Sequence, residues 1–375
     1  MNLVLFFTSG VSLQTWSQNG SMTREIALYK KLQEQGIKVS FVTYGNANDL
    51  KYKDELEGIR ILCNYLNLPP KRYVQLIPIL HFSSLLQADI IKTNQMKGAD
   101  VALRNAKVFR KKFVARCGYL WSDFSSHANK RHADTQDGFL KAQSVESVVF
   151  SSANQIILTT TTMKEYVIKN YGINENKINV IPNYVLTDIF SPKVESFNLN
   201  TGKKRVFSVG RLSEVKNYSS LIKACEGLPV ELAILGEGEL QDALIAEAKD
   251  RGVDLKIYKN IPNHEIPDLM STATIFALVS HYEGHPKALL EAMSCGIAVL
   301  GSDPPGIKAE IVHGVNGWLC KPDSESIRAG ILHLLSNPQL RQELGKNARE
   351  TIVNKYSLEI IAAKEYLVLQ NLMRK

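Results

Sequence analysis

Hydrophobic residues along the chain follow two patterns that alternate with each other. Short and nearly continuous apolar runs, such as Leu3–Phe7, alternate with longer stretches, such as Met22–Gln35, in which apolar residues recur every three or four positions. A short continuous run predicts a buried strand, and the longer period predicts an amphipathic helix. Alternation of the two is typical of a parallel sheet wound with helices. The sequence therefore predicts an α/β fold with doubly wound parallel sheets.

This alternating series occurs twice. The predicted strands of the first series are Leu3–Phe7, Lys38–Thr43, Arg60–Cys63, Asp89–Lys92, Phe113–Arg116, Gln155–Thr159 and Ile178–Pro182. Those of the second series are Arg205–Val209, Val230–Leu235, Asp254–Tyr258, Ile275–Val279, Ile297–Leu300 and Trp318–Cys320. Because 375 residues are too many for one core, we expect two domains. We place them at residues 1–187 and 205–356, with a polar, aperiodic linker at 188–204 and a C-terminal helix at 357–375.

One strand-to-helix turn in the second series carries several polar side chains. The apolar run Ile275–Val279 predicts a buried strand, Pro286 fits the first position of a helix, and Gly296 fits its end. In a parallel sheet such a turn lies where ligands bind, and the first amides of a helix suit a phosphate or a set of hydroxyls. Glu283 and Glu291 can both face one ligand there. These residues alone are equally compatible with an alternative that involves no ligand. In that interpretation, Glu283 is simply a carboxylate in a loop and Glu291 a carboxylate on a solvated helix face.

The sequence around these two carboxylates resembles a known family. The segment SHYEGHPKALLEAMSCGIAVLGSD places seven residues between Glu283 and Glu291. It resembles the signature of the retaining nucleotide-sugar glycosyltransferases of family 4, which have the GT-B fold. Further matching positions are Gly284, Pro286, Leu290, Ala292, Met293, Gly306, Glu310 and Gly317. The resemblance implies two Rossmann-like domains facing a cleft, the first on the acceptor side and the second binding the nucleotide sugar, with residues 357–375 crossing back to the first domain.

A second match follows the first strand of the second series. Gly210, Arg211 and Lys216 lie in a segment that opens a helix and resembles the Gly-Arg…Lys element of the family. Arg211 offers a fork of donors and Lys216 a point charge, which together can hold a diphosphate. The alternative interpretation is a basic turn on the surface.

The resemblance then implies a set of site residues. Glu283, Arg211 and Lys216 are the expected catalytic residues. The expected substrate-binding residues are Gly20, Gly210, Gly284, His285, Pro286, Lys287, Ala288, Leu289 and Glu291. We include Lys287 on helix electrostatics alone, because a cation near the start of a helix is unfavourable there without a ligand, although an ion pair with Glu291 is the alternative. Where many relatives have a His, the chain reads Cys117-Gly-Tyr-Leu-Trp121, so we assign that role to no residue.

The positive charge of the chain is concentrated in its first half. Residues 1–190 contain 23 Lys and Arg against 15 Asp and Glu, whereas residues 191–375 contain 22 of each. This asymmetry favours an anionic partner for the first half, such as a membrane surface, a lipid diphosphate or an acidic glycan. The densest basic run, 104–112, is interpreted either as a solvated helix face or as a patch that contacts an anionic membrane.

These observations together predict a retaining glycosyltransferase of the hexosyltransferase class that acts in polysaccharide, lipopolysaccharide or glycolipid assembly. The expected partners are a nucleotide-diphosphate sugar and a glycan or lipid-linked acceptor, with no nucleic acid, no metal site and no cofactor. Five scattered Cys without a CxxC motif, and no apolar run of membrane-spanning length, suggest a cytoplasmic protein that can associate with the inner face of the membrane. The alternatives are an enzyme resembling a nucleotide-sugar 2-epimerase, or a basic module that binds membrane or nucleic acid.

Overall fold

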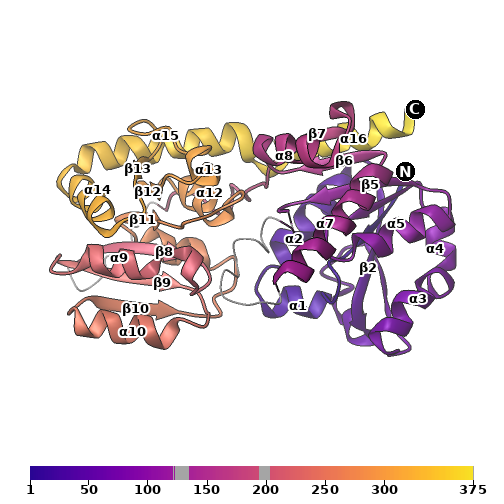
Figure 1. Cartoon of the computed structure of the whole chain (residues 1–375), viewed down its shortest axis with the longest axis horizontal. Helices are drawn as coiled ribbons and strands as arrows, with labels where there is room; N and C mark the ends of the chain where they lie inside the picture. The colour runs from indigo at the N-terminus through magenta and orange to yellow at the C-terminus, as the bar shows by residue number, and fades with distance from the viewer. Residues whose placement is uncertain (121, 123–134, 194–202, 375) are drawn as a thin grey trace. The chain divides into compact units, whose positions relative to one another are not determined.

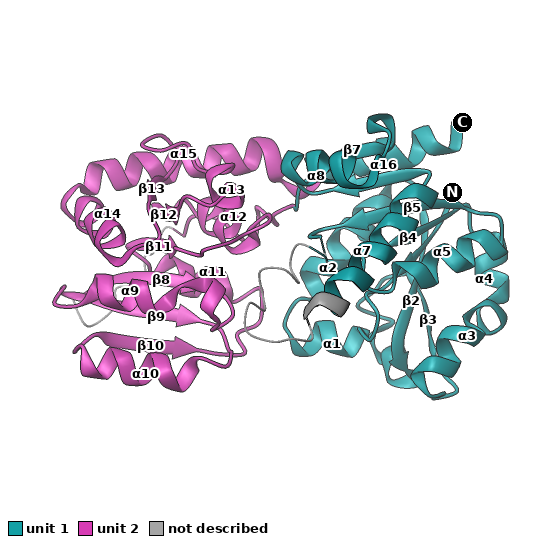
Figure 2. Ribbon diagram, in the orientation of Figure 1, with its two compact units in different colours: residues 1–183, 359–375 teal, residues 184–358 magenta. Residues whose placement is uncertain are grey.

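The computed structural model describes residues 1–120, 122, 135–193 and 203–374, which form two compact units (Figure 1). Unit 1 comprises Met1–Asn183 together with Glu359–Lys375, and unit 2 comprises Tyr184–Leu358 (Figure 2). The division falls earlier than the predicted linker 188–204. Phe190, inside that predicted linker, is buried in the core of unit 2, and positions 194–202 lie outside the described residues.

Unit 1 is built on one parallel seven-stranded sheet of order β3-β2-β1-β4-β5-β6-β7. Its strands are β1 Asn2–Phe6, β2 Lys38–Asn46, β3 Arg60–Asn64, β4 Ile90–Thr93, β5 Lys112–Cys117, β6 Gln155–Leu158 and β7 Ile178–Val180. Its α-helices are α1 Leu13–Gln18, α2 Met22–Glu34, α3 Pro70–Leu80, α4 Phe82–Gln87, α5 Ala99–Val108, α7 Thr135–Ser152, α8 Thr161–Tyr171 and α16 Leu358–Arg374, with 3₁₀ turns η1 Ala47–Tyr52 and η2 Glu175–Lys177. All seven strands predicted for this half are present, because each is a compact apolar run buried by the helices around it.

Unit 2 is built on a parallel six-stranded sheet of order β10-β9-β8-β11-β12-β13. Its strands are β8 Lys204–Val209, β9 Val230–Leu235, β10 Asp254–Tyr258, β11 Ile275–Leu278, β12 Val299–Ser302 and β13 Trp318–Cys320. Its helices are α9 Tyr218–Cys225, α10 Gln241–Asp250, α11 Ile266–Ser271, α12 Lys287–Ser294, α13 Pro305–Lys308, α14 Ser324–Ser336 and α15 Pro338–Tyr356, with the 3₁₀ turn η3 Glu214–Lys216. Within the described residues, no helix combines the length and apolar composition needed to span a bilayer.

The four central strands of the unit 2 sheet, β9, β8, β11 and β12, are buried on both faces, which explains their nearly continuous apolar sequences. Successive residues of a strand point to opposite faces. In β8, Val206 packs with α9 and α14 residues such as Leu221 and Ile331, whereas Phe207 joins the cluster around α12 that includes Leu289 and Met293. β8 therefore lies at the centre of the unit, with a helical layer on each side.

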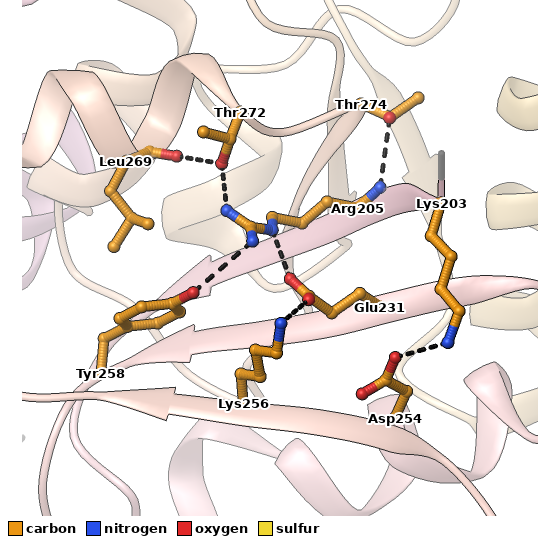
Figure 3. A network of polar contacts seen from close by, with 9 residues as sticks. All are labelled: Lys203, Arg205, Glu231, Asp254, Lys256, Tyr258, Leu269, Thr272 and Thr274. Carbon is orange, nitrogen blue, oxygen red and sulfur yellow. Dashed lines mark hydrogen bonds and ion pairs between the residues drawn. The ribbon is translucent and has the colours of Figure 1, made fainter. Parts of the chain in front are cut away.

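A buried polar network fixes the amino-terminal end of β8 (Figure 3). Arg205 Nε lies 2.5 Å from Glu231 Oε1, and both side chains are almost wholly buried. The guanidinium also donates to Thr272 Oγ1, and Lys256 pairs with the second oxygen of Glu231. A buried ion pair stabilises a fold only when its remaining hydrogen-bonding groups are satisfied, as they are here. The network joins β8, β9 and β10 to the turn after α11, and so fixes β8, one of the two strands that carry the site described below.

The C-terminal helix is joined to unit 1 by a second buried ion pair. Lys92, in β4, is fully buried and pairs with Glu365 of α16, while its ammonium also donates to Tyr29 Oη at 3.3 Å. Two charges removed from water in this way stabilise a structure only as a pair, because either one alone would be left unsolvated.

We expect Glu365→Gln to lower the free energy of unfolding by about 3–5 kcal/mol, because it leaves the Lys92 ammonium buried without a counter-charge. Replacing both partners, Lys92→Met with Glu365→Leu, should be much less destabilising. Urea unfolding measures both, with Glu359→Gln on the exposed face of the same helix as the control. A loss below about 1 kcal/mol for Glu365→Gln contradicts this account of the helix.

Candidate functional site

Two loops that are far apart in the sequence leave the unit 2 sheet side by side. β8 pairs with β9 on one side and with β11 on the other, so the strand order reverses between β8 and β11. The loops 210–217 and 279–286 follow these two strands, and the amide of His281 donates to Val215 O at 2.8 Å. In open parallel sheets, ligands bind at the point where the strand order reverses. The site residues predicted in unit 2 cluster at this point.

An ion pair joins the two loops. Lys216 Nζ lies 2.5 Å from Glu283 Oε1, and the same oxygen accepts a hydrogen bond of 2.7 Å from Ser280 Oγ. The side chains of Lys216 and Glu283 are 22% and 12% exposed, so the pair is shielded but still open to a ligand. Partial burial strengthens the attraction between the two charges relative to a pair in bulk water. The carboxylate and the ammonium are thus held in one place before any ligand binds.

Asn217 holds the turn in which this lysine lies. Its backbone is in the left-handed region, with φ 58° and ψ 36°, a conformation that Asn adopts more readily than most residues. Its side-chain amide donates to Val279 O at 3.0 Å and to Pro322 O at 2.7 Å. The same residue therefore shapes the loop after β8 and ties it to the end of β11.

Two glycines allow backbones to pass very close to each other beneath the loops. A Cβ at Gly236 would lie 1.9 Å from Gly210 O, and a Cβ at Gly306 would lie 2.1 Å from Glu283 O. Both distances are far below van der Waals contact, so neither position can accept a side chain without movement of the loop. The loop that carries Glu283 is therefore supported from below by the start of α13.

Helix α12 begins one residue later than the sequence suggested. Pro286 is the N-cap, with ψ 96°, rather than the first helical residue, so that Lys287 takes the first position. The difference arises because the extended ψ of Pro286 keeps it outside the helix while its carbonyl already accepts from Leu289 and Leu290. The helix ends as predicted, with Gly296 at φ 71° just after the C-cap.

The residues expected along α12 differ in their exposure. Ala288 is partly exposed, whereas Leu289 is fully buried in the core. Glu291 is only 5% exposed, so the alternative of a carboxylate on a solvated helix face is wrong. A carboxylate removed from water in this way forms stronger hydrogen bonds with the groups that reach it.

His285 faces the protein interior rather than the open side of the loop. Its side chain is 1% exposed, its Nε2 lies 3.3 Å from Glu310 Oε1, and its ring packs against Tyr356 with the centroids 5.6 Å apart. Burial alone would raise the pKa of Glu310, but hydrogen bonds with His285 and Tyr356, together with electrostatic attraction to His285 and Lys355, outweigh it and leave that pKa below its ordinary value. The imidazole therefore anchors the loop between Gly284 and Pro286 to the region of Glu310.

Two of the predicted residues remain, Arg211 on the loop after β8 and Gly20 in unit 1. The side chain of Arg211 is exposed and, within the described part of the chain, makes no hydrogen bond or ion pair. Gly20 belongs to unit 1, where it has φ 65° in the turn between α1 and α2. Trp121, which marks the end of the segment where relatives have a His, lies outside the described residues.

Sequence reasoning missed two residues that the structure places at the centre of the site. Ser280 and Asn217 hold Glu283 and the two loops in position, as described above. The only signals for them in the sequence are that each lies at a loop end, where Ser and Asn hydrogen-bond to nearby groups more often than elsewhere. Among the described residues, no group of three or more His, Cys, Asp or Glu is arranged to hold a metal ion.

Comparison with protein families decides the classification. The model described as "Glycosyl transferases group 1" matches residues 191–351, and the model described as "Glycosyltransferase Family 4" matches residues 19–188. The chain belongs to glycosyltransferase family 4. The two matches of family 4 models meet close to the division between the two units.

Individual relatives agree with membership of family 4. The chain is 28% identical over 265 residues to an uncharacterized glycosyltransferase of Methanocaldococcus jannaschii, covering 66% of this chain and 64% of the relative. It is 29% identical over 208 residues to the N-acetylgalactosamine-N,N'-diacetylbacillosaminyl-diphospho-undecaprenol 4-alpha-N-acetylgalactosaminyltransferase of Campylobacter jejuni, covering 54% of this chain and 56% of the relative. The chain thus spans a little over half to just under two thirds of the length of these two curated relatives.

The fold is that of the GT-B glycosyltransferases. HepE from Anabaena, solved in complex with UDP-glucose, matches 99% of this chain and 100% of its own with a TM-score of 0.78 and 18% identity. Two parallel doubly wound sheets in one chain are the two Rossmann-like domains that the GT-B fold requires. The fold class predicted from the alternating pattern and the family resemblance is confirmed.

We expect Glu310→Gln to destabilise unit 2 by about 1.5–3 kcal/mol near pH 7, because it removes a buried charge-assisted hydrogen bond. The folded-state pKa of Glu310 lies below its ordinary value of 4.5, so this stability is present above pH 4.5 and is lost as pH falls through the folded pKa. The melting temperatures of wild type and variant should therefore converge as the pH falls below 4.5 and passes through the folded-state pKa. A constant difference between them across this range contradicts the assignment.

Proposed function

We propose that the protein is a retaining glycosyltransferase that moves a sugar from a nucleotide-diphosphate sugar to an acceptor hydroxyl in glycan or glycolipid assembly. The observation that carries the proposal is the Lys216–Glu283 pair, which sets a cation and a carboxylate side by side where the unit 2 strand order reverses. A nucleotide-diphosphate sugar offers a diphosphate anion that can bind Lys216 and sugar hydroxyls that can donate to Glu283. The solved complex of HepE with UDP-glucose, a chain with the same fold, supports this class of donor.

Arg211 and Lys216 would neutralise the diphosphate as it leaves. Arg211 is exposed at the start of its loop, and Lys216 points towards Glu283 from the other end of the same loop. An ammonium has three donor hydrogens, so Lys216 can keep its bond to Glu283 and still donate to a phosphate oxygen. Charges fixed in advance where negative charge develops lower the barrier without further reorganisation.

Glu283 and Glu291 would receive the hydroxyl groups of the donor. Glu283, oriented by Ser280 and supported by the close approach of Gly306, would accept from the sugar together with the amides of Gly284 and the residues after it. Glu291, desolvated on α12, would accept from the ribose hydroxyls. The buried imidazole of His285 would act by positioning the loop, while the first turn of α12, with Lys287, would add positive potential at the donor.

Replacing Arg211 by Ala should lower kcat/KM for the nucleotide sugar at least tenfold, since a charge-assisted contact contributes about 1.5–3 kcal/mol. Lys216→Ala should cost at least as much and should also lower the melting temperature, because Glu283 loses its partner. Lys249→Ala, on an exposed face of α10, is the matched control and should leave kcat/KM unchanged. An unchanged kcat/KM in both loop variants, or release of free sugar without any acceptor, contradicts the proposed function.

A surface of unit 1 supports a peripheral contact with an anionic membrane. Large apolar side chains are exposed on α3, α4 and the end of α5: Ile79, Phe82, Leu86 and Val108. Phe82 packs against Phe109 with the ring centroids 5.8 Å apart, and Lys111 Nζ donates to Leu86 O at 2.6 Å. Exposed apolar groups beside Lys107, Arg110 and Lys111 suit the boundary between lipid headgroups and acyl chains. Two relatives, named as transferases that act on sugars linked to diphospho-undecaprenol, fit such a contact.

Association with vesicles tests this contact. Binding to anionic vesicles should weaken as salt rises above physiological strength, where the Debye length is about 8 Å. The triple variant Lys107→Gln, Arg110→Gln, Lys111→Gln should bind about a hundredfold more weakly, since each cation near an anionic surface contributes about 1 kcal/mol. A control triple of exposed lysines elsewhere in unit 1, Lys38→Gln, Lys51→Gln, Lys169→Gln, should bind like the wild type. Equal binding to neutral and anionic vesicles, or none to either, rules the contact out.

A further inference from the structure

Unit 1 contains a cavity of about 780 Å³ that holds none of the site residues named above. Its walls come from the carboxyl ends of several strands. Ser9 follows β1, Tyr44 and Asn64 lie at the ends of β2 and β3, and Lys97 follows β4. The strand order of unit 1 reverses between β1 and β4, so the cavity lies where an open parallel sheet binds ligands. Its volume is within the range of small-molecule sites.

The charged residues lining this cavity are mostly cations. Lys71 comes from α3, Lys97 from the loop after β4, Arg104 from α5 and Lys141 from α7, against the single carboxylate of Asp100. Arg104 donates to the backbone oxygen of Val74. Within the described residues, the three lysines form no ion pair. The four cationic side chains are exposed to solvent, and together they give the mouth of the cavity a positive potential that attracts anions.

The other groups in the walls of the cavity suit a phosphate that is part of a larger molecule, such as a phosphosugar or a lipid phosphate. Burial, and then the negative charge of Asp100, raise the pKa of Tyr44 to about 12, so its hydroxyl stays protonated and can donate. Val74, Val101 and Val145 supply apolar surface beside the charges. The cavity therefore combines donors for an anion with walls that can pack against a sugar ring or a lipid chain.

The start of α5 adds backbone donors at the same place. Gly98 is the N-cap of this ten-residue helix, with φ 92°, and a Cβ there would lie only 3.0 Å from the amide nitrogen of Ser9. A glycine is required for this close approach between the helix start and the loop after β1. The first backbone amides of a helix favour the binding of a phosphate, so the start of α5 and the lysines that line the cavity favour the same kind of ligand.

We propose that this cavity binds a phosphate or diphosphate group carried by the acceptor, with Lys71, Lys97 and Lys141 as its cationic ligands. Several cations around one cavity match the two or more negative charges of a phosphate group better than the single charge of a carboxylate, and lysine binds phosphate as a point charge. The identification of the ligand as the acceptor rests on the proposed function, whereas the binding of phosphate to unit 1 does not.

Inorganic pyrophosphate is a direct probe of this site. To remove binding at the loops of unit 2, calorimetric titration would use the Arg211→Ala, Lys216→Ala variant at low ionic strength. Adding the cavity triple Lys71→Gln, Lys97→Gln, Lys141→Gln should weaken pyrophosphate binding at least tenfold. Adding the control triple Lys38→Gln, Lys51→Gln, Lys169→Gln, which removes the same charge from exposed positions of unit 1, should change it less than twofold. Equal losses in the two triples, or no loss in the cavity triple, overturn the proposal.

Further measurements separate a folding defect and a failure of the proposed function from a failure of this site. The three lysines are exposed, so the melting temperature of the cavity triple should stay close to that of the wild type, and a clearly lower value would mean that these lysines are structural. Binding of a nucleotide-diphosphate sugar to the cavity triple should match the wild type. If no nucleotide sugar binds either protein while pyrophosphate still distinguishes the triples, the proposed function fails and the phosphate site stands.

A third comparison identifies the source of the phosphate. Farnesyl diphosphate should bind the unit 2 double variant more tightly than pyrophosphate if the acceptor is a lipid diphosphate, because the prenyl chain can pack on the apolar wall. Glucose 1-phosphate should bind better than pyrophosphate if the acceptor is a soluble phosphosugar. In both cases the cavity triple should abolish the difference. A difference that survives in the cavity triple places the binding elsewhere and contradicts the proposal.

Discussion

The ion pair between Lys216 and Glu283 depends on one constraint, the parallel pairing of β8 with β11 at the centre of the unit 2 sheet. These two strands are separated by a long stretch of sequence, and only their adjacency brings the loops that follow them together. The buried network around Arg205 holds the amino-terminal end of β8, and Asn217 ties its carboxyl-terminal loop to β11. The site is therefore a consequence of how the sheet is fixed at both ends of one strand.

The same arrangement recurs in unit 1 with different chemistry. There too the strand order reverses beside the first strand, and a cavity opens at the carboxyl ends of the strands. Unit 2 presents a cation and carboxylates on rigid loops, whereas unit 1 presents several lysines around an open volume. The same fold, used twice, thus carries a candidate site in unit 2 and a cavity in unit 1 that differ in charge, which matches the uneven distribution of charge along the sequence.

Most of the fold could be predicted from the sequence, because strands and helices each have a characteristic local spacing of apolar residues. Every predicted strand is present, and the stretch Met22–Gln35, predicted to be an amphipathic helix, forms α2, Met22–Glu34. The short helix α1 is not predicted by the sequence pattern, since its start depends on a distant group. For α1, the carboxylate of Asp49 accepts from the amides of Leu13 and Gln14 at 3.2 Å, a contact that no local pattern reports.

The candidate site could be predicted only in part, for a related reason. The motifs identified Glu283, Arg211 and Lys216, but they could not indicate that Lys216 pairs with Glu283 or that His285 points inward to Glu310. Both facts depend on which loops meet, and therefore on tertiary structure. The cations that line the unit 1 cavity could not be predicted as a group, because they come from four separate elements and share no sequence motif.

The most direct test of the central claim is the thermal stability of the full chain in the presence of a panel of nucleotide-diphosphate sugars. A ligand that binds only the folded protein stabilises it by about 2.7 kcal/mol at one hundred times its Kd. The account predicts that at least one of these nucleotide sugars raises the melting temperature, that the matching free sugar does not, and that Arg211→Ala with Lys216→Ala removes the effect. If no member of a panel covering the common bases and hexoses raises the melting temperature, or if the double variant responds like the wild type, the assignment of the donor to these loops is contradicted.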